Sequence, residues 1–240
     1  MTEIRRAVSE DVAGIAMIVQ DVWQQEIDLE VCRGQLEDSS GAIWVAAEAG
    51  AIVGFVSAFL TVDQAGLRRW EVDLLAVRQT SRGYGLGQKL VAATWGDAQR
   101  HQARLARAAV RVANFASQGT FKPSGYVTDG RVHKLLIWSP EACTDQISWP
   151  QQVTCLPVDT LTYCGLWLEG LTSPGVSHDS QRRALKAARA LSAQQGRLNI
   201  GALIPGEEEF RLSDDLRTIA ADHGEYHWWQ KLLAPRKPGF

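Results

Sequence analysis

A strand, a glycine loop and a helix follow one another in the first half of the chain, and this succession constrains the fold most. Glu71–Val77 is an apolar, β-prone run, Arg82–Gly87 reads Arg-Gly-Tyr-Gly-Leu-Gly, and a helix is predicted from about Leu86. Glycine at alternate positions lets the backbone turn tightly with its N–H groups facing inward. The helix N-terminus and Arg82 add positive charge. The loop is therefore predicted to bind a phosphate or pyrophosphate, although an ordinary turn is the alternative.

Two common phosphate motifs are excluded by the residues that follow the loop. The dinucleotide fingerprint needs glycine at position 88, where the chain has Gln88. A Walker A loop needs Gly-Lys-Ser/Thr at its end, and this chain has Gly-Gln-Lys there. If the loop binds a phosphate, it therefore belongs to another type of phosphate-binding site.

The pattern Arg82-x-x-Gly85-x-Gly87, five residues after a Leu-Ala-Val strand, resembles the acetyl-CoA loop of GNAT-type N-acyltransferases. The resemblance extends over residues 4–138 and includes the Ile-Arg-x-Ala opening. Its last part follows the expected fifth strand, where successive positions of the family's motif are matched in order by Asn114, Ser117, Phe121, Gly125 and Tyr126. The resemblance implies an α/β (α+β) fold of the GNAT type, with a mixed, mostly antiparallel central sheet and flanking helices.

The resemblance also implies which residues contact acetyl-CoA. Backbone groups of Leu75, Ala76 and Val77 would hold the pantetheine arm, and the N–H near Leu75 would stabilise the oxyanion. Further contacts are expected from Asn114, Ser117 and Phe121. The pyrophosphate would lie on the amides of the loop and first helical turn, which are Arg82, Gly83, Tyr84, Gly85, Leu86, Gly87 and Gln88.

Two carboxylates on the same strand are candidates for the general base that acyl transfer to an amine requires. Relatives that acetylate protein lysines use a glutamate at the position of Glu71, and Asp73 shares its face of the strand. The alternative for Glu71 is an ion pair with Arg68 or Arg69. Many relatives place a tyrosine acid where this chain has Phe121, and phenylalanine cannot donate a proton.

The chain is long enough for a large domain followed by a smaller one. We expect a GNAT domain over residues 1–139, a linker over 140–150, and a truncated, degenerate GNAT-like unit over 151–240. The predicted β-α-β-α-β order of that unit consists of a strand at 161–171, a helix at 180–195, a strand at 199–204, a helix at 210–222 and a strand at 226–233. Its loop at 172–180 lacks Arg-x-x-Gly-x-Gly, and Pro174 removes an N–H. This unit is expected to bind no coenzyme.

Composition restricts the partners. The formal net charge is −2, so no nucleic-acid surface is predicted. No signal peptide or membrane-spanning run is recognised, and the four cysteines lack C-x-x-C spacing, which favours reduced thiols and a cytoplasmic location. His223 and His227 lie four residues apart without a third ligand, so no metal is expected. A homodimer is left open.

The sequence therefore predicts an acetyl-CoA-dependent N-acetyltransferase that acts on a primary amine, most simply of a small molecule. Two alternatives remain at this stage. One is a non-catalytic, CoA-binding or regulatory module that has lost its acid. The other is an acyl-thioester decarboxylase on the same fold.

Overall fold

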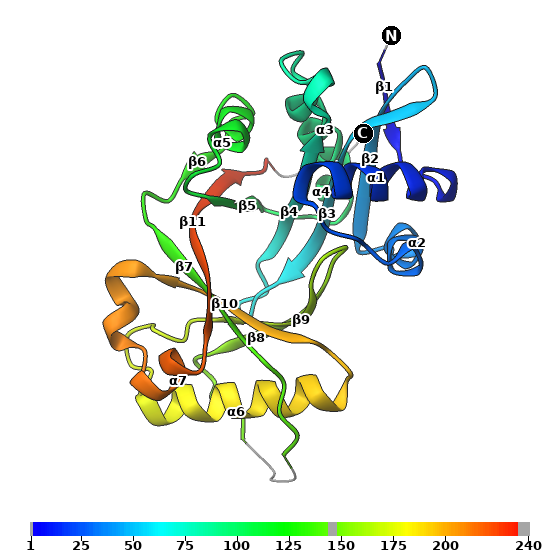
Figure 1. Ribbon diagram of the computed structural model, residues 1–240. Coiled ribbons are helices and arrows are strands. Elements are labelled where there is room, and N and C mark those ends of the chain that lie inside the picture. The colour runs from blue at the N-terminus through cyan, green and yellow to red at the C-terminus, as the bar shows by residue number, and fades with distance from the viewer. Residues whose placement is uncertain (1, 144–147, 235–240) are drawn as a thin grey trace, which may run out of the picture. The chain divides into compact units, whose positions relative to one another are not determined.

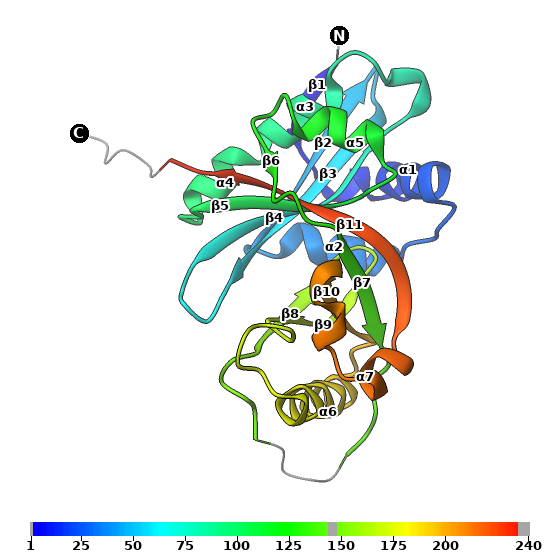
Figure 2. The same ribbon diagram turned by 90° about the vertical axis from the view of Figure 1, so that its left-hand side faces the viewer.

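The computed structural model describes residues 2–143 and 148–234. Contacts divide the chain into two compact units. Unit 1 consists of Met1–Asp129 and Trp228–Phe240, and unit 2 consists of Gly130–His227. Figure 1 and Figure 2 label the helices and strands of both units.

Unit 1 contains the predicted strand, glycine loop and helix, which are the end of β4, the loop Arg82–Gly85 and α3. Its elements are β1 (Glu3–Arg6), η1 (Ser9–Asp11), α1 (Val12–Trp23), α2 (Leu29–Glu37), β2 (Gly41–Glu48), β3 (Ala51–Val62), β4 (Arg68–Val77), η2 (Gln79–Ser81), α3 (Leu86–Ala93), α4 (Trp95–Arg100), β5 (Leu105–Arg111), α5 (Phe115–Phe121), β6 (Val127–Thr128) and the end of β11 (Ala221–Leu232).

The sheet of unit 1 has the order β1-β2-β3-β4-β5-β11, and β6 also pairs with β11. The neighbours from β1 to β4 are antiparallel, whereas β4 and β5 are parallel. The turn between β2 and β3 lies at Ala49 and Gly50, both of which have positive φ. The expected mixed, mostly antiparallel sheet with flanking helices is confirmed.

Helices cover both faces of this sheet. On one face, Leu86, Leu90 and Val91 of α3 pack with Val56 of β3 and Trp70 of β4 in a single apolar cluster. On the opposite face, the ring of Trp23 from α1 meets the ring of Phe55 edge-on, with centroids 6.3 Å apart. Figure 2 shows α1 and α3 on different sides of the strands. The burial of these apolar stripes fixes the start of α3 beside the end of β4.

Close packing of α3 depends on Gly54 in β3. A Cβ atom at this position would lie 2.9 Å from the carbonyl oxygen of Ala76 and 3.3 Å from a methyl group of Leu90. The helix after the glycine loop, α3, ends before Thr94. The hydroxyl of Thr94 donates to the carbonyl oxygen of Val91, and α4 begins afterwards.

The strands of unit 2 continue the same hydrogen-bonded sheet in the order β11-β7-β10-β9-β8, and β9 and β10 are parallel. A long helix, α6, connects the two parallel strands. The elements are β7 (His133–Trp138), β8 (Thr154–Asp159), β9 (Cys164–Glu169), α6 (His178–Gln194), β10 (Asn199–Pro205), η3 (Gly206–Arg211), α7 (Asp214–Thr218) and the start of β11.

Two details of the predicted β-α-β-α-β order in unit 2 are wrong. A further strand, β8, precedes β9 and pairs with it antiparallel. The helix predicted over 210–222 is replaced by the turn of η3 and the short α7, and residue 221 already belongs to β11. The backbone of Ser213 is extended at the start of α7, so a single helix cannot run through this region.

The division of the chain also differs from the expected boundaries at 139 and 151. Strand β7, expected as the last strand of the first domain, belongs to unit 2, whereas residues 228–232 belong to unit 1. The reason is that β11 is one continuous strand. Its first part pairs with β7, and its last part lies between β5 and β6 in the sheet of unit 1. A boundary inside a continuous strand leaves no linker that composition could reveal.

The end of β11 should therefore be required for the stability of unit 1. The side chain of Trp229 is 5% exposed and lies in the apolar cluster of unit 1. Replacing Trp229 by alanine should lower the free energy of unfolding by about 3–5 kcal/mol, measured by denaturant titration. Leu232→Ala is the control, because Leu232 is 85% exposed and should change stability by no more than about 0.5 kcal/mol. Equal stability of the two variants would contradict this role.

Candidate active site

The predicted phosphate loop is open to its surroundings. Gly83 and Gly85 have φ values of 88° and 72°, which an L side chain rarely adopts. A Cβ atom built at either position would meet no atom within 4 Å. Tyr84, between them, is 75% exposed. The positive φ values therefore explain why glycine stands at positions 83 and 85, and the space above the loop is open.

Helix α3 presents an uncapped N-terminus behind this loop. Gly85 is its N-cap residue in left-handed conformation, and no side chain of the described residues caps the first turn. The first amides of a helix have no intrahelical partner, so those of Leu86, Gly87 and Gln88 are left for solvent or a ligand. Leu86 is buried and anchors the helix, while Gln88 is exposed. This end of α3 can therefore accept an anion, as the sequence analysis predicts.

Arg82 is tied to the preceding strand. Its Nε donates to the carbonyl oxygen of Val77 at 2.9 Å, and the residue is exposed. This bond holds the guanidinium at the mouth of the loop, where its charge adds to that of the helix end. It also occupies the carbonyl of Val77, one of the three residues expected to hold the pantetheine.

Strands β4 and β5 separate where the thioester is expected. Their parallel ladder joins Arg69 to Leu105, Trp70 to Ala106 and Glu71 to Arg107, and no further rung is present in these described strands. Leu75, Ala76 and Val77 lie beyond the last rung. Their other neighbour, β3, remains paired with them. The backbone edge of β4 that faces away from β3 is thus available to an extended ligand.

An irregularity in β4 lies just before these residues. The register with β3 shifts between the pairs Val56–Leu75 and Ala58–Val72, so that Asp73 and Leu74 together lie opposite Ser57. The N–H of Leu74 donates to the hydroxyl of Ser57 at 3.2 Å. Such bulges redirect the residues around them. Here Asp73 becomes exposed.

The two candidate bases lie in different surroundings. Glu71 is 7% exposed and accepts from Arg107 Nε with both oxygens, at 2.9 and 2.7 Å, and from the hydroxyl of Thr61 at 2.5 Å. Arg69 Nε lies 3.5 Å away. Asp73 is exposed, with Ser57 Oγ 3.4 Å from one of its oxygens. The predicted ion pair of Glu71 is present with Arg69. Arg68 instead donates a hydrogen bond from Nε to the carbonyl oxygen of His101.

Arg107, Thr61 and Trp228 are members of this site that the sequence did not point to. Arg107 Cζ lies 4.2 Å from the centroid of a Trp228 ring, so the guanidinium is stacked as well as ion-paired. A prediction that β4 and β5 pair in parallel, with the observed register, would have placed Arg107 opposite Glu71. Nothing in the sequence indicated that Trp228 returns to unit 1.

Asn114 and Ser117 serve the local structure of α5. The side-chain oxygen of Asn114 accepts from the N–H of Ser117 at 3.1 Å, which caps the helix. Both residues therefore lie at the start of α5, a short distance after β5 ends at Arg111. Contact of either with coenzyme A stays a prediction.

Phe121 and Tyr126 pack against each other in the core of unit 1. Their ring centroids are 5.1 Å apart in an edge-on arrangement, and the two residues are 3% and 1% exposed. Burial raises the pKa of the Tyr126 hydroxyl to about 12, which makes it a weak proton donor to a thiolate. Tyr126 therefore does not replace the hydroxyl that Phe121 lacks.

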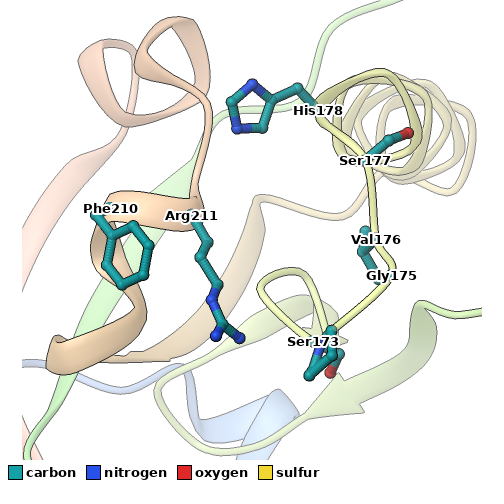
Figure 3. Close-up of a pocket in the computed structure, with 8 residues that line it drawn as sticks. Ser173, Gly175, Val176, Ser177, His178, Phe210 and Arg211 are labelled. Atoms are coloured by element: carbon teal, nitrogen blue, oxygen red, sulfur yellow. The ribbon is translucent and has the colours of Figure 1, made fainter.

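The loop before α6 in unit 2 differs from the glycine loop because a side chain caps the helix that follows it. Helix α6 also follows a strand of a parallel pair, but the Ser177 side chain caps it by accepting from the N–H of Ser180 at 3.2 Å. A hollow of about 480 Å³ lies beside this end (Figure 3). It is lined by Ser173, Pro174, Gly175, Val176, Ser177, His178, Phe210 and Arg211.

The described part of the chain offers neither a metal site nor a membrane-spanning helix. No cluster of three or more His, Cys, Asp or Glu side chains in residues 2–143 and 148–234 is arranged to hold a metal ion. His223 and His227 lie on strand β11 rather than on a helix. Across the same residues, every helix is too short or too polar to span a membrane.

The model of the acetyltransferase (GNAT) family matches residues 9–126. No match was found among curated proteins.

Solved structures with the same fold include two that cover nearly the whole chain. A GCN5-related N-acetyltransferase from Sphaerobacter thermophilus is 14% identical, with a TM-score of 0.57, and the alignment covers 98% of this chain and 96% of that one. A glucosamine N-acetyltransferase region of a fungal multi-domain β-N-acetylglucosaminidase is 12% identical, with a TM-score of 0.60, over 96% of this chain and 38% of that one. A putative acetyltransferase from Salmonella typhimurium, solved with acetyl-CoA, is 21% identical over 55% and 83%, with a TM-score of 0.49.

Substitution of Gly85 tests the loop. Gly85→Val should weaken CoA binding at least tenfold, because the side chain would disturb the left-handed turn and fill the space above the amides (about 1.4 kcal/mol per factor of ten). Isothermal titration calorimetry measures the effect. Gly50→Val is a matched control, since Gly50 also has positive φ and open space but lies in the β2–β3 turn. CoA affinity in folded Gly85→Val equal to that of the control would disprove the assignment.

Proposed function

We propose that this chain, whose residues 9–126 belong to the acetyltransferase (GNAT) family, transfers an acetyl group from acetyl-CoA to a primary amine. One observation carries the proposal. The N-terminus of α3 is uncapped behind an open glycine loop, directly after a strand that has separated from its parallel neighbour. This arrangement offers amides to a pyrophosphate and a strand edge to a pantetheine arm.

Acetyl-CoA would supply the acetyl group as an activated thioester. The amides between Arg82 and Gln88 would hold its pyrophosphate. Backbone groups of Leu75 and Ala76 would contact the pantetheine, since the Val77 carbonyl is occupied by Arg82. The N–H near Leu75 would donate to the oxyanion that forms on the acetyl carbonyl.

The proposed reaction begins with deprotonation of the incoming ammonium by a carboxylate of β4. The nitrogen lone pair then forms a bond to the acetyl carbon, and the carbon–sulfur bond breaks with its electron pair on sulfur. The thiolate takes the second proton lost from nitrogen. The products are the acetylated amine and free CoA thiol, and the first proton passes from the carboxylate to solvent. Glu71 and Asp73 are the candidates for this carboxylate.

Loss of a thiolate does not demand a strong acid, because a thiol is far more acidic than an alcohol or an amine. The buried Phe121 is therefore compatible with transfer in which the second proton lost from nitrogen reaches the sulfur through solvent. The same residue favours a second candidate function, a module that binds CoA without turning it over. The acceptor is proposed to be a small-molecule amine, with neither nucleic acid nor membrane as partner.

A panel of amines with detection of free thiol separates the two candidates. The panel should include polyamines, amino acids, aminoglycosides and an amino sugar, the last because a fungal region of the same fold carries the description glucosamine N-acetyltransferase. The expected result is thiol release from acetyl-CoA that depends on one class of amine. Tight CoA binding without amine-dependent thiol release across the panel would favour the module.

Restoring a hydroxyl at Phe121 tests the role of the missing acid. Phe121→Tyr should leave turnover unchanged or raise it, by no more than the roughly 10²–10⁴-fold typical of positioned acid–base groups. Phe115→Tyr is the control, because Phe115 lies at the other end of α5 and is 78% exposed. If Phe121→Tyr only weakens CoA binding, the hydroxyl has no partner at this place, and its burial costs roughly 1–3 kcal/mol. The position would then be one of packing alone.

A further inference from the structure

The ion pair between Glu71 and Arg107 lies at the last rung shared by β4 and β5. The two residues face each other in the parallel register, and the ladder ends with them. Past this rung, β4 continues to Val77 and β5 continues to Arg111. The pair therefore marks the point at which the two strands begin to separate.

The carboxylate of Glu71 is engaged on three sides. Arg107 Nε contacts both of its oxygens, the Thr61 hydroxyl of β3 donates to Oε1, and Arg69 Nε lies 3.5 Å from the same oxygen. The side chains of Glu71 and Arg107 are only 9% and 11% exposed. To take a proton from an acceptor, Glu71 would have to weaken charge-assisted bonds in a site with little water. This surrounding suits a structural carboxylate better than a base.

Strand β11 closes the arrangement from the side of β5. The Trp228 ring stacks on the Arg107 guanidinium, and the next residue, Trp229, is buried in the core of unit 1. Thr61, Glu71, Arg107 and Trp228 thus connect β3, β4, β5 and β11, and we call these four residues the fork clamp. Glu71 accepts from the edge of the Arg107 guanidinium, and Trp228 packs on its face.

We propose that Glu71 is a positioning residue which, through Arg107 and Trp228, fixes where β4 and β5 separate, and that Asp73 takes the proton of the acceptor ammonium. The fork clamp holds the strand whose residues Leu75 and Ala76 would meet the thioester. Asp73 lies two residues beyond Glu71, at the bulge and exposed. The role of Asp73 as base rests on the proposed acetyl transfer. The effect of the fork clamp on CoA binding can be measured whether or not transfer occurs.

The test combines pH profiles with CoA affinity. Glu71→Gln and Arg107→Met should each weaken CoA binding and lower kcat, by up to about 10²-fold, because reacting groups are displaced. The double variant should lose no more than the worse single variant, since both changes open the same clamp. Both single variants should keep the acidic limb of the kcat/KM profile, and Asp73→Asn should lose it while binding CoA normally.

Trp228 supplies a conservative control. Trp228→Phe keeps an aromatic face for Arg107 and should resemble the unmodified chain, whereas Trp228→Ala should share the defect in CoA affinity. If circular dichroism shows that Arg107→Met does not fold, the CoA affinities of Trp228→Phe and Trp228→Ala still test the role of the clamp.

Three results would overturn the inference. The first is loss of the acidic limb in Glu71→Gln with normal CoA affinity, which would make Glu71 the base. The second is an intact limb in Asp73→Asn. The third is normal CoA affinity in all clamp variants. If the unmodified chain shows no transfer to any amine, the proposed function fails, and the affinity measurements still test the clamp.

Discussion

The separation of β4 from β5 is the constraint on which the rest of the site depends. Parallel strands that stayed paired to their ends would leave no backbone edge between them for a ligand. Here the ladder stops at Glu71 and Arg107, and the free part of β4 leads directly into the glycine loop and the uncapped end of α3. Gly54 allows α3 to pack closely enough on β3 and β4 to hold that end in place.

Comparison of the two strand–loop–helix segments of the chain shows which feature distinguishes an anion site from an ordinary connection. Both α3 and α6 follow a strand of a parallel pair. The amides of α3 have no side-chain cap, whereas Ser177 caps α6, and Pro174 in the preceding loop has no N–H to offer. A helix dipole alone therefore does not make a site, because a side chain that satisfies the amides removes the positions a phosphate would use.

Much of unit 1 could be predicted because its signals are local. The β2–β3 turn, the glycine loop and the start of α3 are each specified by residues within a few positions. The partners of Glu71 were predicted incompletely, because Arg107 is brought there by a parallel register that only the folded sheet defines. The division into units was missed for a similar reason. Strand β11 belongs to both units without a break, so neither a linker nor a change of composition marks the boundary.

Calorimetric titration of the intact chain with CoA tests the central claim most directly, namely that the end of α3 is an anion site and the end of α6 is not. The account predicts one binding site per chain, whose affinity is unchanged when Ser177 is replaced by alanine in the α6 cap. Two equivalent sites, or an affinity that responds to Ser177→Ala, would contradict it. So would the absence of any heat or saturable binding with the unmodified chain.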